Sequence, residues 1–266
     1  MTVADELSAV PWTQFFHKVV IIGDDFAAGV GDYITVGSAG GGIAPYLQKI
    51  VSQDDKASTA QPSALCSEVR HTWAIINAGV PGSTTADWLL SSPKKYFNNV
   101  FSSRATADVS IVIIILGSVE INLLMSLPPV DRNPSAAGHE MRRNLVEICD
   151  TLRKKGKQVC LATVAGPDPI ATETDSASST LNTALEHFCK STSTEDAPVI
   201  LGPRLDTYAF RRESALWVDK HRFNSQSYRQ LARNTADFLI PMMTAVEWTT
   251  WKEQLGRVTY DKALYD

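Results

Sequence analysis

Short apolar runs alternate along the chain with longer segments in which apolar positions recur every three to four residues. A run rich in β-branched residues is typical of a strand covered on both faces, and the longer period is that of an amphipathic helix. The predicted strands are residues 18–22, 73–76, 109–116, 158–164 and 199–201. The predicted helices are residues 42–51, 84–102 (interrupted at Pro93), 137–155, 176–189 and 224–239.

This alternation predicts a three-layer α/β/α sandwich with a mainly parallel, five-stranded sheet of the flavodoxin-like kind. In such sheets ligands bind beyond the carboxyl ends of the strands, so we expect the functional residues directly after each strand. We expect one domain over residues 1–240 and a C-terminal extension over residues 241–266. The extension is rich in aromatic residues, namely Trp248, Trp251, Tyr260 and Tyr265. It either packs on its own domain or binds a protein partner.

Composition narrows the possible classes of protein. The chain has 266 residues, 44% of them hydrophobic and 20% charged, which are ordinary values for a folded domain. A formal net charge of −4 argues against a nucleic-acid-binding protein, which needs clustered positive charge. No apolar run reaches the roughly 20 residues needed to span a membrane. The N-terminus does not resemble a signal peptide, so we expect an intracellular protein, cytoplasmic unless a presequence directs it to an organelle.

No metal or cofactor site is expected from the sequence. The cysteines Cys66, Cys149, Cys160 and Cys189 are widely spaced, which favours reduced, buried thiols. His17, His71 and His139 have no companion ligands nearby in the sequence, and we interpret them as surface or core residues.

The segment IIGDDFAAGVGD ends the first predicted strand and continues beyond it. It resembles the first conserved block of the SGNH (GDSL-type) hydrolases, in which GDS is followed by small residues and a further glycine. Gly23, Asp24 and Gly29 match that block, but Asp25 stands where the resemblance places the nucleophilic serine. A carboxylate is a weaker nucleophile than an activated serine, and its charge repels a developing oxyanion.

Two further blocks follow the next strands. NAGVPGSTTADWL resembles the second block, and the resemblance makes Gly82 a backbone donor to the oxyanion. LGSVEIN resembles the third block, G-x-N-D, but Val119 replaces the oxyanion-binding asparagine and Glu120 stands at the acidic position. Loss of one such donor typically lowers turnover by about 100- to 1,000-fold.

The last block precedes the final helix. WVDKHRFNSQSYRQLA resembles D-x-x-H-P-x-x-x-G-Y, with Asp219 at the aspartate and Arg222 at the histidine. Arginine stays protonated and cannot act as a general base. His221 is adjacent and is the possible replacement base.

The resemblance spans residues 18–240 and implies the SGNH fold. Because nucleophile, oxyanion asparagine and base are all replaced, it also implies a catalytically inactive protein that acts by binding. That protein would be a structural or accessory subunit of a larger assembly, or a binder of a small ligand. The alternative is an active serine-type esterase that uses His221 with a displaced nucleophile such as Ser83 or Ser118. A third hypothesis, a phosphoacceptor receiver domain, is suggested by the pair Asp24–Asp25 after the first strand. That fold needs an acceptor aspartate at the end of its third strand, and the segment LGSVE of this chain supplies none.

If the serine and histidine positions adjoin, Asp25 and Arg222 should meet, with Asp219 behind them. We therefore predict a charged cluster Asp25–Arg222–Asp219 that ties the turn after the first strand to the start of the final helix. Breaking a buried pair from one side typically costs about 3–5 kcal/mol.

Overall fold

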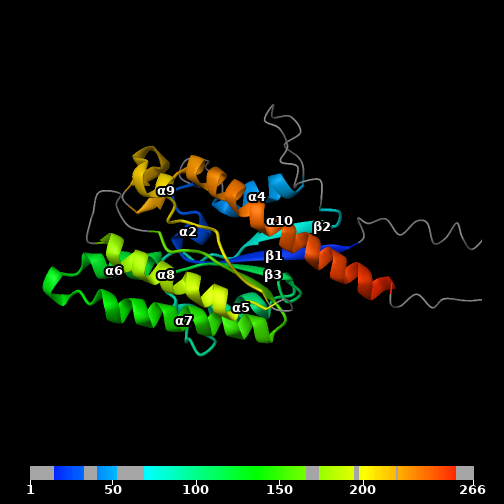
Figure 1. The fold of residues 1–266 in the computed structure, drawn as a ribbon, viewed down its shortest axis with the longest axis horizontal. Helices are drawn as coiled ribbons and strands as arrows, with labels where there is room; N and C mark the ends of the chain where they lie inside the picture. Colours follow the sequence, from blue (N-terminus) through cyan, green and yellow to red (C-terminus); the bar gives the residue numbers. More distant parts are fainter. Residues whose placement is uncertain are drawn as a thin grey trace, which may run out of the picture.

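A parallel sheet of five strands forms the centre of the molecule (Figure 1). The computed structural model describes residues 15–32, 41–52, 69–165, 174–194, 198–219 and 221–255. The strands are β1 (Phe16–Gly23), β2 (Thr72–Asn77), β3 (Ile111–Ile115), β4 (Gln158–Leu161) and β5 (Val199–Leu201), in the order β2-β1-β3-β4-β5. All four neighbouring pairs are parallel. The predicted fold class is confirmed.

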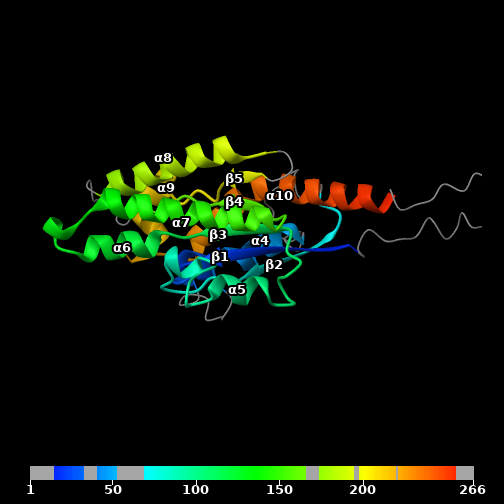
Figure 2. The same cartoon turned by 90° about the horizontal axis from the view of Figure 1, so that it is seen from below.

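Helices cover both faces of the sheet, as the sequence predicts. On one side lie α4 (Ile43–Val51) and α10 (Ser225–Leu255), and on the other lie α5 (Tyr96–Phe101), α7 (Pro134–Lys154) and α8 (Thr174–Thr192). Figure 2 shows α7 and α8 side by side. The short helices are α2 (Asp25–Ala28), α6 (Ser118–Ser126), α9 (Tyr208–Arg212), η4 (Ala86–Trp88), η5 (Pro129–Asp131) and η6 (Ser214–Leu216).

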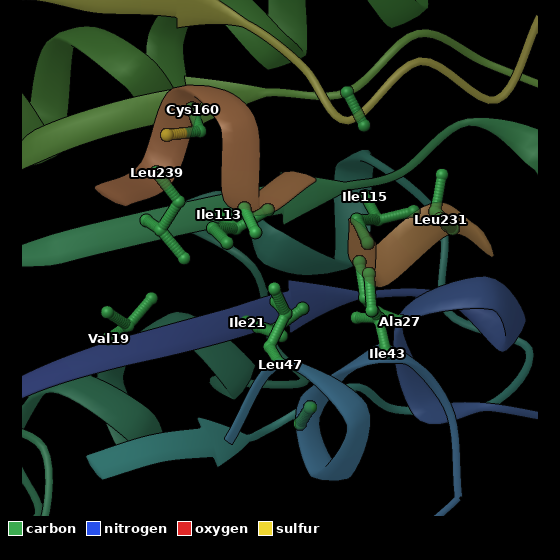
Figure 3. Packing of buried hydrophobic residues seen from close by; sticks show 14 of the residues in the cluster. Val19, Ile21, Ala27, Ile43, Leu47, Ile113, Ile115, Cys160, Leu231 and Leu239 are labelled. Atoms are coloured by element: carbon green, nitrogen blue, oxygen red, sulfur yellow. The ribbon is translucent and has the colours of Figure 1, made fainter. Parts of the chain in front are cut away.

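The central strands supply the core of both layers because successive side chains point to opposite faces. Ile113 and Ile115 of β3 join the cluster beneath α4 and α10, where Figure 3 shows them near Leu231 and Ile21. Ile114, between them, belongs to the cluster beneath α7 and α8. A run that is buried on both faces is apolar throughout, which is why the pattern of this strand was easy to predict.

Several boundaries differ from the prediction. The predicted strand 109–116 is shorter in the structure, Ile111–Ile115, and Gly117, at φ 114°, is the N-cap of α6. The predicted strand 158–164 ends at Leu161, and the predicted helix 84–102 is replaced by the shorter η4 and α5. A small antiparallel hairpin, β6 (Trp217–Asp219) and β7 (Arg222–Phe223), precedes the last helix and was not predicted.

The final helix begins after Asn224, as predicted, but its predicted end at residue 239 is wrong. Asn224 Oδ1 accepts hydrogen bonds from two backbone N–H groups of the first turn. The helix then runs through Pro241 to Leu255, and Met242 and Met243, next to the proline, are buried in the core. This packing offsets the loss of one helical hydrogen bond at the proline. The described part of the predicted extension, residues 241–255, therefore continues α10.

Within the described residues, no helix has both the length and the apolar character needed to cross a membrane. Cys149, Cys160 and Cys189 are free, buried thiols, and burial raises the pKa of each. Cys66, Tyr260 and Tyr265 lie outside the described residues.

Candidate functional site

The turns after β1, β2 and β3 meet at the carboxyl edge of the sheet, because β1 lies between the other two strands. Gly23, the last residue of β1, pairs with Ile115, and Asp24 N donates to Ile115 O at 3.0 Å. A Cβ on Gly23 would lie 1.8 Å from the Ile115 carbonyl oxygen, and its φ is +149°. The close approach of the two strands therefore requires glycine at this position.

Asp24 is a buried carboxyl group that joins two of these turns. Its Oδ1 accepts from Phe26 N at 3.0 Å and so caps α2, while its Oδ2 accepts from Ser118 N at 3.0 Å, at the start of α6. The residue is 0% exposed. Burial raises the pKa of Asp24 to about 8, the negative charge of Glu120 adds to the rise, and the two backbone donors offset part of it.

Asp25 and Gly82 are brought together. Asp25 Oδ1 accepts a hydrogen bond from the backbone N–H of Gly82 at 2.6 Å, across the gap between the turns after β1 and β2. Asp25 is half-buried, and Gly82 adopts a left-handed φ of +72°. The N–H of Gly82, which the family resemblance makes an oxyanion donor, therefore already donates to a carboxylate oxygen of this chain.

The turn after β3 enters α6 directly. Val119 is partly exposed in the first turn of the helix and offers no hydrogen-bonding side chain. Glu120 reaches the turn that follows β2, where its side chain accepts a hydrogen bond from the backbone N–H of Thr85. Burial raises the pKa of Glu120 as well. Asn144, from α7, supports the same turn by donating to Thr85 Oγ1 at 3.1 Å.

The hairpin before α10 holds Asp219, His221 and Arg222. Asp219 Oδ1 accepts from the backbone N–H of His221 at 2.8 Å, and Arg222 Nη1 lies 3.6 Å from Asp219 Oδ2. The two charged side chains are 46% and 45% exposed. His221 Nδ1 lies 3.1 Å from Asn122 Oδ1, which links the hairpin to α6.

The predicted cluster Asp25–Arg222–Asp219 is only half present, and its Asp25–Arg222 bond is a correction. Among the described ion pairs, Arg222 bonds to Asp219, whereas Asp25 bonds to Gly82. Arg222 is the exposed residue of a two-residue strand and has a carboxylate three residues before it in the same hairpin. Local pairing in water is easier than burial of the guanidinium against the turn after β1.

The two serines considered as displaced nucleophiles are both buried. Ser83 is 2% exposed; its Oγ donates to Gly23 O at 3.0 Å and accepts from Trp88 Nε1 at 2.9 Å. Ser118 is 4% exposed at the buried start of α6. His221, by contrast, is exposed. The described hydrogen bonds join neither serine to an imidazole.

Solved structures with this architecture are known. The structure is similar to a carbohydrate esterase family 3 from Talaromyces cellulolyticus, with 15% sequence identity and a TM-score of 0.56, covering 86% of this chain and 99% of that one. It is similar to an acetylxylan esterase from Geobacillus stearothermophilus (15% identity, TM-score 0.57, 82% and 91% coverage). It also resembles a member of the lipolytic protein G-D-S-L family from Veillonella parvula (14% identity, TM-score 0.51, 84% and 98% coverage).

The chain has the fold of the SGNH hydrolases. No family model matches the sequence, and no curated protein matches it either. The likeness thus lies in the arrangement of strands and helices.

Sequence reasoning missed two parts of the site of this SGNH fold. The carboxyl of Asp24 binds Ser118 N across 94 positions of the chain, and Asn122 meets His221 across 99 positions. A sequence motif records the residue after each strand but not which backbone group its side chain will find. Among the described residues, no group of three or more His, Cys, Asp or Glu could hold a metal ion.

Proposed function

We propose that this chain is a catalytically inactive protein of the SGNH-hydrolase fold that acts by binding, as a structural or accessory subunit of a larger assembly. The observation that carries the proposal is the 2.6 Å hydrogen bond from Gly82 N to Asp25 Oδ1. An oxyanion site must present unoccupied donors to a negative charge that forms during the reaction. In this chain the side-chain carboxylate of Asp25 already accepts the hydrogen bond of the Gly82 N–H.

The rest of the site supports the same conclusion. Structures of similar fold are named as esterases and lipases, and such enzymes need a nucleophile next to a base. Asp25 stands at the nucleophile position of the resemblance, Val119 provides no amide, and Arg222 cannot accept a proton. The alternative hydrolase has a candidate base in His221, but both serines proposed as its nucleophile are buried, and the hydroxyl of Ser83 bonds to Gly23 O and Trp88 Nε1.

An exposed aromatic side chain supports a role in binding a protein. Trp248, on the last turns of α10, is 54% exposed and stacks on Trp251 with ring centroids 5.0 Å apart. Exposed tryptophan is enriched at protein interfaces because it offers a large apolar area with few rotatable bonds. We place the partner on this aromatic segment.

The test of inactivity is hydrolysis of p-nitrophenyl acetate by the purified chain. We expect the wild type and Asp25→Ala to show the same rate, equal to that of buffer. Asp25→Ser alone should remain inactive because Arg222 accepts no proton. The triple variant Asp25→Ser, Val119→Asn and Arg222→His, which restores nucleophile, oxyanion amide and base, should show turnover above buffer. Wild-type turnover that disappears in His221→Ala would instead establish the alternative hydrolase.

The binding role is tested on the protein purified from its native source. We expect it to migrate by size-exclusion chromatography in an assembly larger than the chain alone. Trp248→Ala should return it to the size of the free chain, whereas His187→Ala, on the exposed side of α8, should not. Migration of the wild type as a free chain would contradict the proposal.

A further inference from the structure

Two buried histidines face each other at the amino ends of β1 and β2, at the opposite end of the sheet from the site described above. His17 Nε2 lies 2.8 Å from His71 Nδ1, and the residues are 9% and 6% exposed. His17 is the second residue of β1, and its register partner in β2 is Trp73. The pair was not expected from the sequence, because 54 positions separate the two residues.

Aromatic rings enclose this pair. The Phe15 ring stacks on His71 with centroids 4.7 Å apart, and the Trp73 ring lies 4.7 Å from His17. The imidazoles themselves are nearly coplanar, with an interplanar angle of 11°. The hydrogen bond between them is therefore formed in a fixed geometry and away from most of the solvent.

A buried carboxylate from α10 completes the cluster. Glu247 is 5% exposed, and its Oε1 accepts from His71 N at 2.8 Å and from Trp73 Nε1 at 2.8 Å. Its Oε2 accepts from Arg70 N at 2.9 Å. One side chain of α10 thus holds the segment that enters β2, and His71 connects this segment to β1.

The number of protons decides whether the bond between the imidazoles can exist. One nitrogen must carry the hydrogen and the other must offer a lone pair, which a neutral pair or a singly protonated pair provides. When both rings are protonated, two N–H groups with positive charge face each other at 2.8 Å, and the bond is lost. The rings must then separate.

We propose that His17, His71 and Glu247 form an acid-sensitive clasp, which holds the carboxyl-terminal turns of α10 against the amino ends of β1 and β2 and opens on acidification. Trp248 and Trp251 follow Glu247 on the same turns. Opening of the clasp therefore changes the position of the exposed aromatic pair. The clasp stands on this geometry and does not depend on the proposed function.

The charges around the clasp set the direction of the effect. Burial lowers the pKa of His17 and of His71 below 6.5, the other ring lowers that of His17 further, and Glu247 from α10 raises both. Three other side chains come from the segments around the clasp. Arg70 is exposed, and Lys18 of β1 forms an ion pair with Asp108 at 2.6 Å. Gln48 of α4, which donates to the Trp73 carbonyl in β2, carries no charge.

Because the pKa values of the closed state are lowered, the open state takes up protons first as the pH falls below about 6.5. The closed clasp is therefore fully stabilised above pH 6.5 and loses stability below it.

The test follows hydrogen exchange of the Trp73 indole N–H and the His71 backbone amide in the full chain by NMR, corrected for the intrinsic effect of pH on exchange. In the wild type we expect protection at both positions to fall at least tenfold between pH 7.5 and pH 5.0. The double variant His17→Gln, His71→Asn places uncharged amides at the two facing nitrogens and should keep its protection within twofold. His139→Gln with His187→Gln, which changes two exposed histidines, should behave like the wild type.

An unchanged wild type, or an equal loss in the double variant, would overturn the proposal. Should the double variant fold poorly, the imidazole ¹⁵N shifts of the wild type decide. A pair that shares one hydrogen at pH 7.5 and loses its coupling together with the Trp73 protection supports the clasp. Two histidines that titrate independently, with Trp73 unaffected, refute it.

Discussion

Replacing Asp24 with asparagine should change how the stability of the protein depends on pH. Asp24 is 0% exposed, and burial raises its pKa to about 8 from an ordinary value of 3.8. Between these two values the unfolded chain has lost the proton and the folded chain keeps it. The stabilisation that results is complete below pH 3.8 and is lost as the pH rises towards 8.

The magnitude follows from the size of this pH window. One pH unit inside it costs the wild type between about 1 and 1.5 kcal/mol of unfolding free energy, so the loss between pH 5 and pH 8 is roughly 3–4 kcal/mol. Asparagine does not titrate and should be free of this loss. Its NH₂ group, however, replaces an oxygen that accepts from Phe26 N or Ser118 N, which costs about 1–3 kcal/mol at every pH. Because the wild type has already lost about 1.5 kcal/mol at pH 5, the variant should lie within about 1.5 kcal/mol of it there, and should be the more stable protein by about 2–4 kcal/mol at pH 8.

Urea unfolding followed by tryptophan fluorescence at pH 5, 6, 7 and 8 measures both curves. The difference between variant and wild type isolates Asp24 from the other titrating groups, among them His17 and His71. Glu140→Gln, a change of an exposed carboxylate on α7, is the control and should leave the shape of the curve unchanged. Parallel curves for Asp24→Asn and the wild type would refute the reasoning, since they would mean that Asp24 titrates alike in both states.

Two further changes test the packing of the site. Arg222→Ala breaks an ion pair whose side chains are 46% and 45% exposed, so we expect thermal unfolding to show a loss of less than about 1 kcal/mol; a loss near 3 kcal/mol would indicate a buried network. Gly23→Ala puts a Cβ 1.8 Å from Ile115 O and should prevent folding, whereas Gly82→Ala meets nothing within 4 Å and should cost about 1–2 kcal/mol for its positive φ; similar circular dichroism and melting of both variants would contradict this.

The fold was predictable because its strands are defined by local sequence. A strand buried on both faces must be apolar at every position, and β3 and β5 were predicted within two residues of their observed ends. Boundaries were missed where tertiary packing outweighs local preference. Pro241 predicts the end of a helix, but burial of Met242 and Met243 keeps α10 intact beyond it.

The candidate site was predictable only as a set of positions. The residues after the strands were identified, and Asp25 and Gly82 do meet. Which partner each side chain chooses was not predictable, because Asp25, Arg222 and Asp219 offer several pairings of opposite charge or donor and acceptor. The clasp could not be predicted from the sequence either, because His17, His71 and Glu247 come from three distant segments and no sequence pattern links them.

Under the proposed function, the bond between Asp25 and Gly82 also explains how the fold can keep a former oxyanion loop without catalysis. The N–H of Gly82 lies in an exposed turn, and in an enzyme such a donor must stay available for the substrate. A carboxylate at position 25 satisfies this donor within the chain and joins the turns after β1 and β2 by a charge-assisted hydrogen bond. The same contact that removes the site for an oxyanion thus stabilises the edge of the sheet. For this reason Asp25→Ser alone should lower stability without producing activity, and activity should appear only when Arg222→His and Val119→Asn are added.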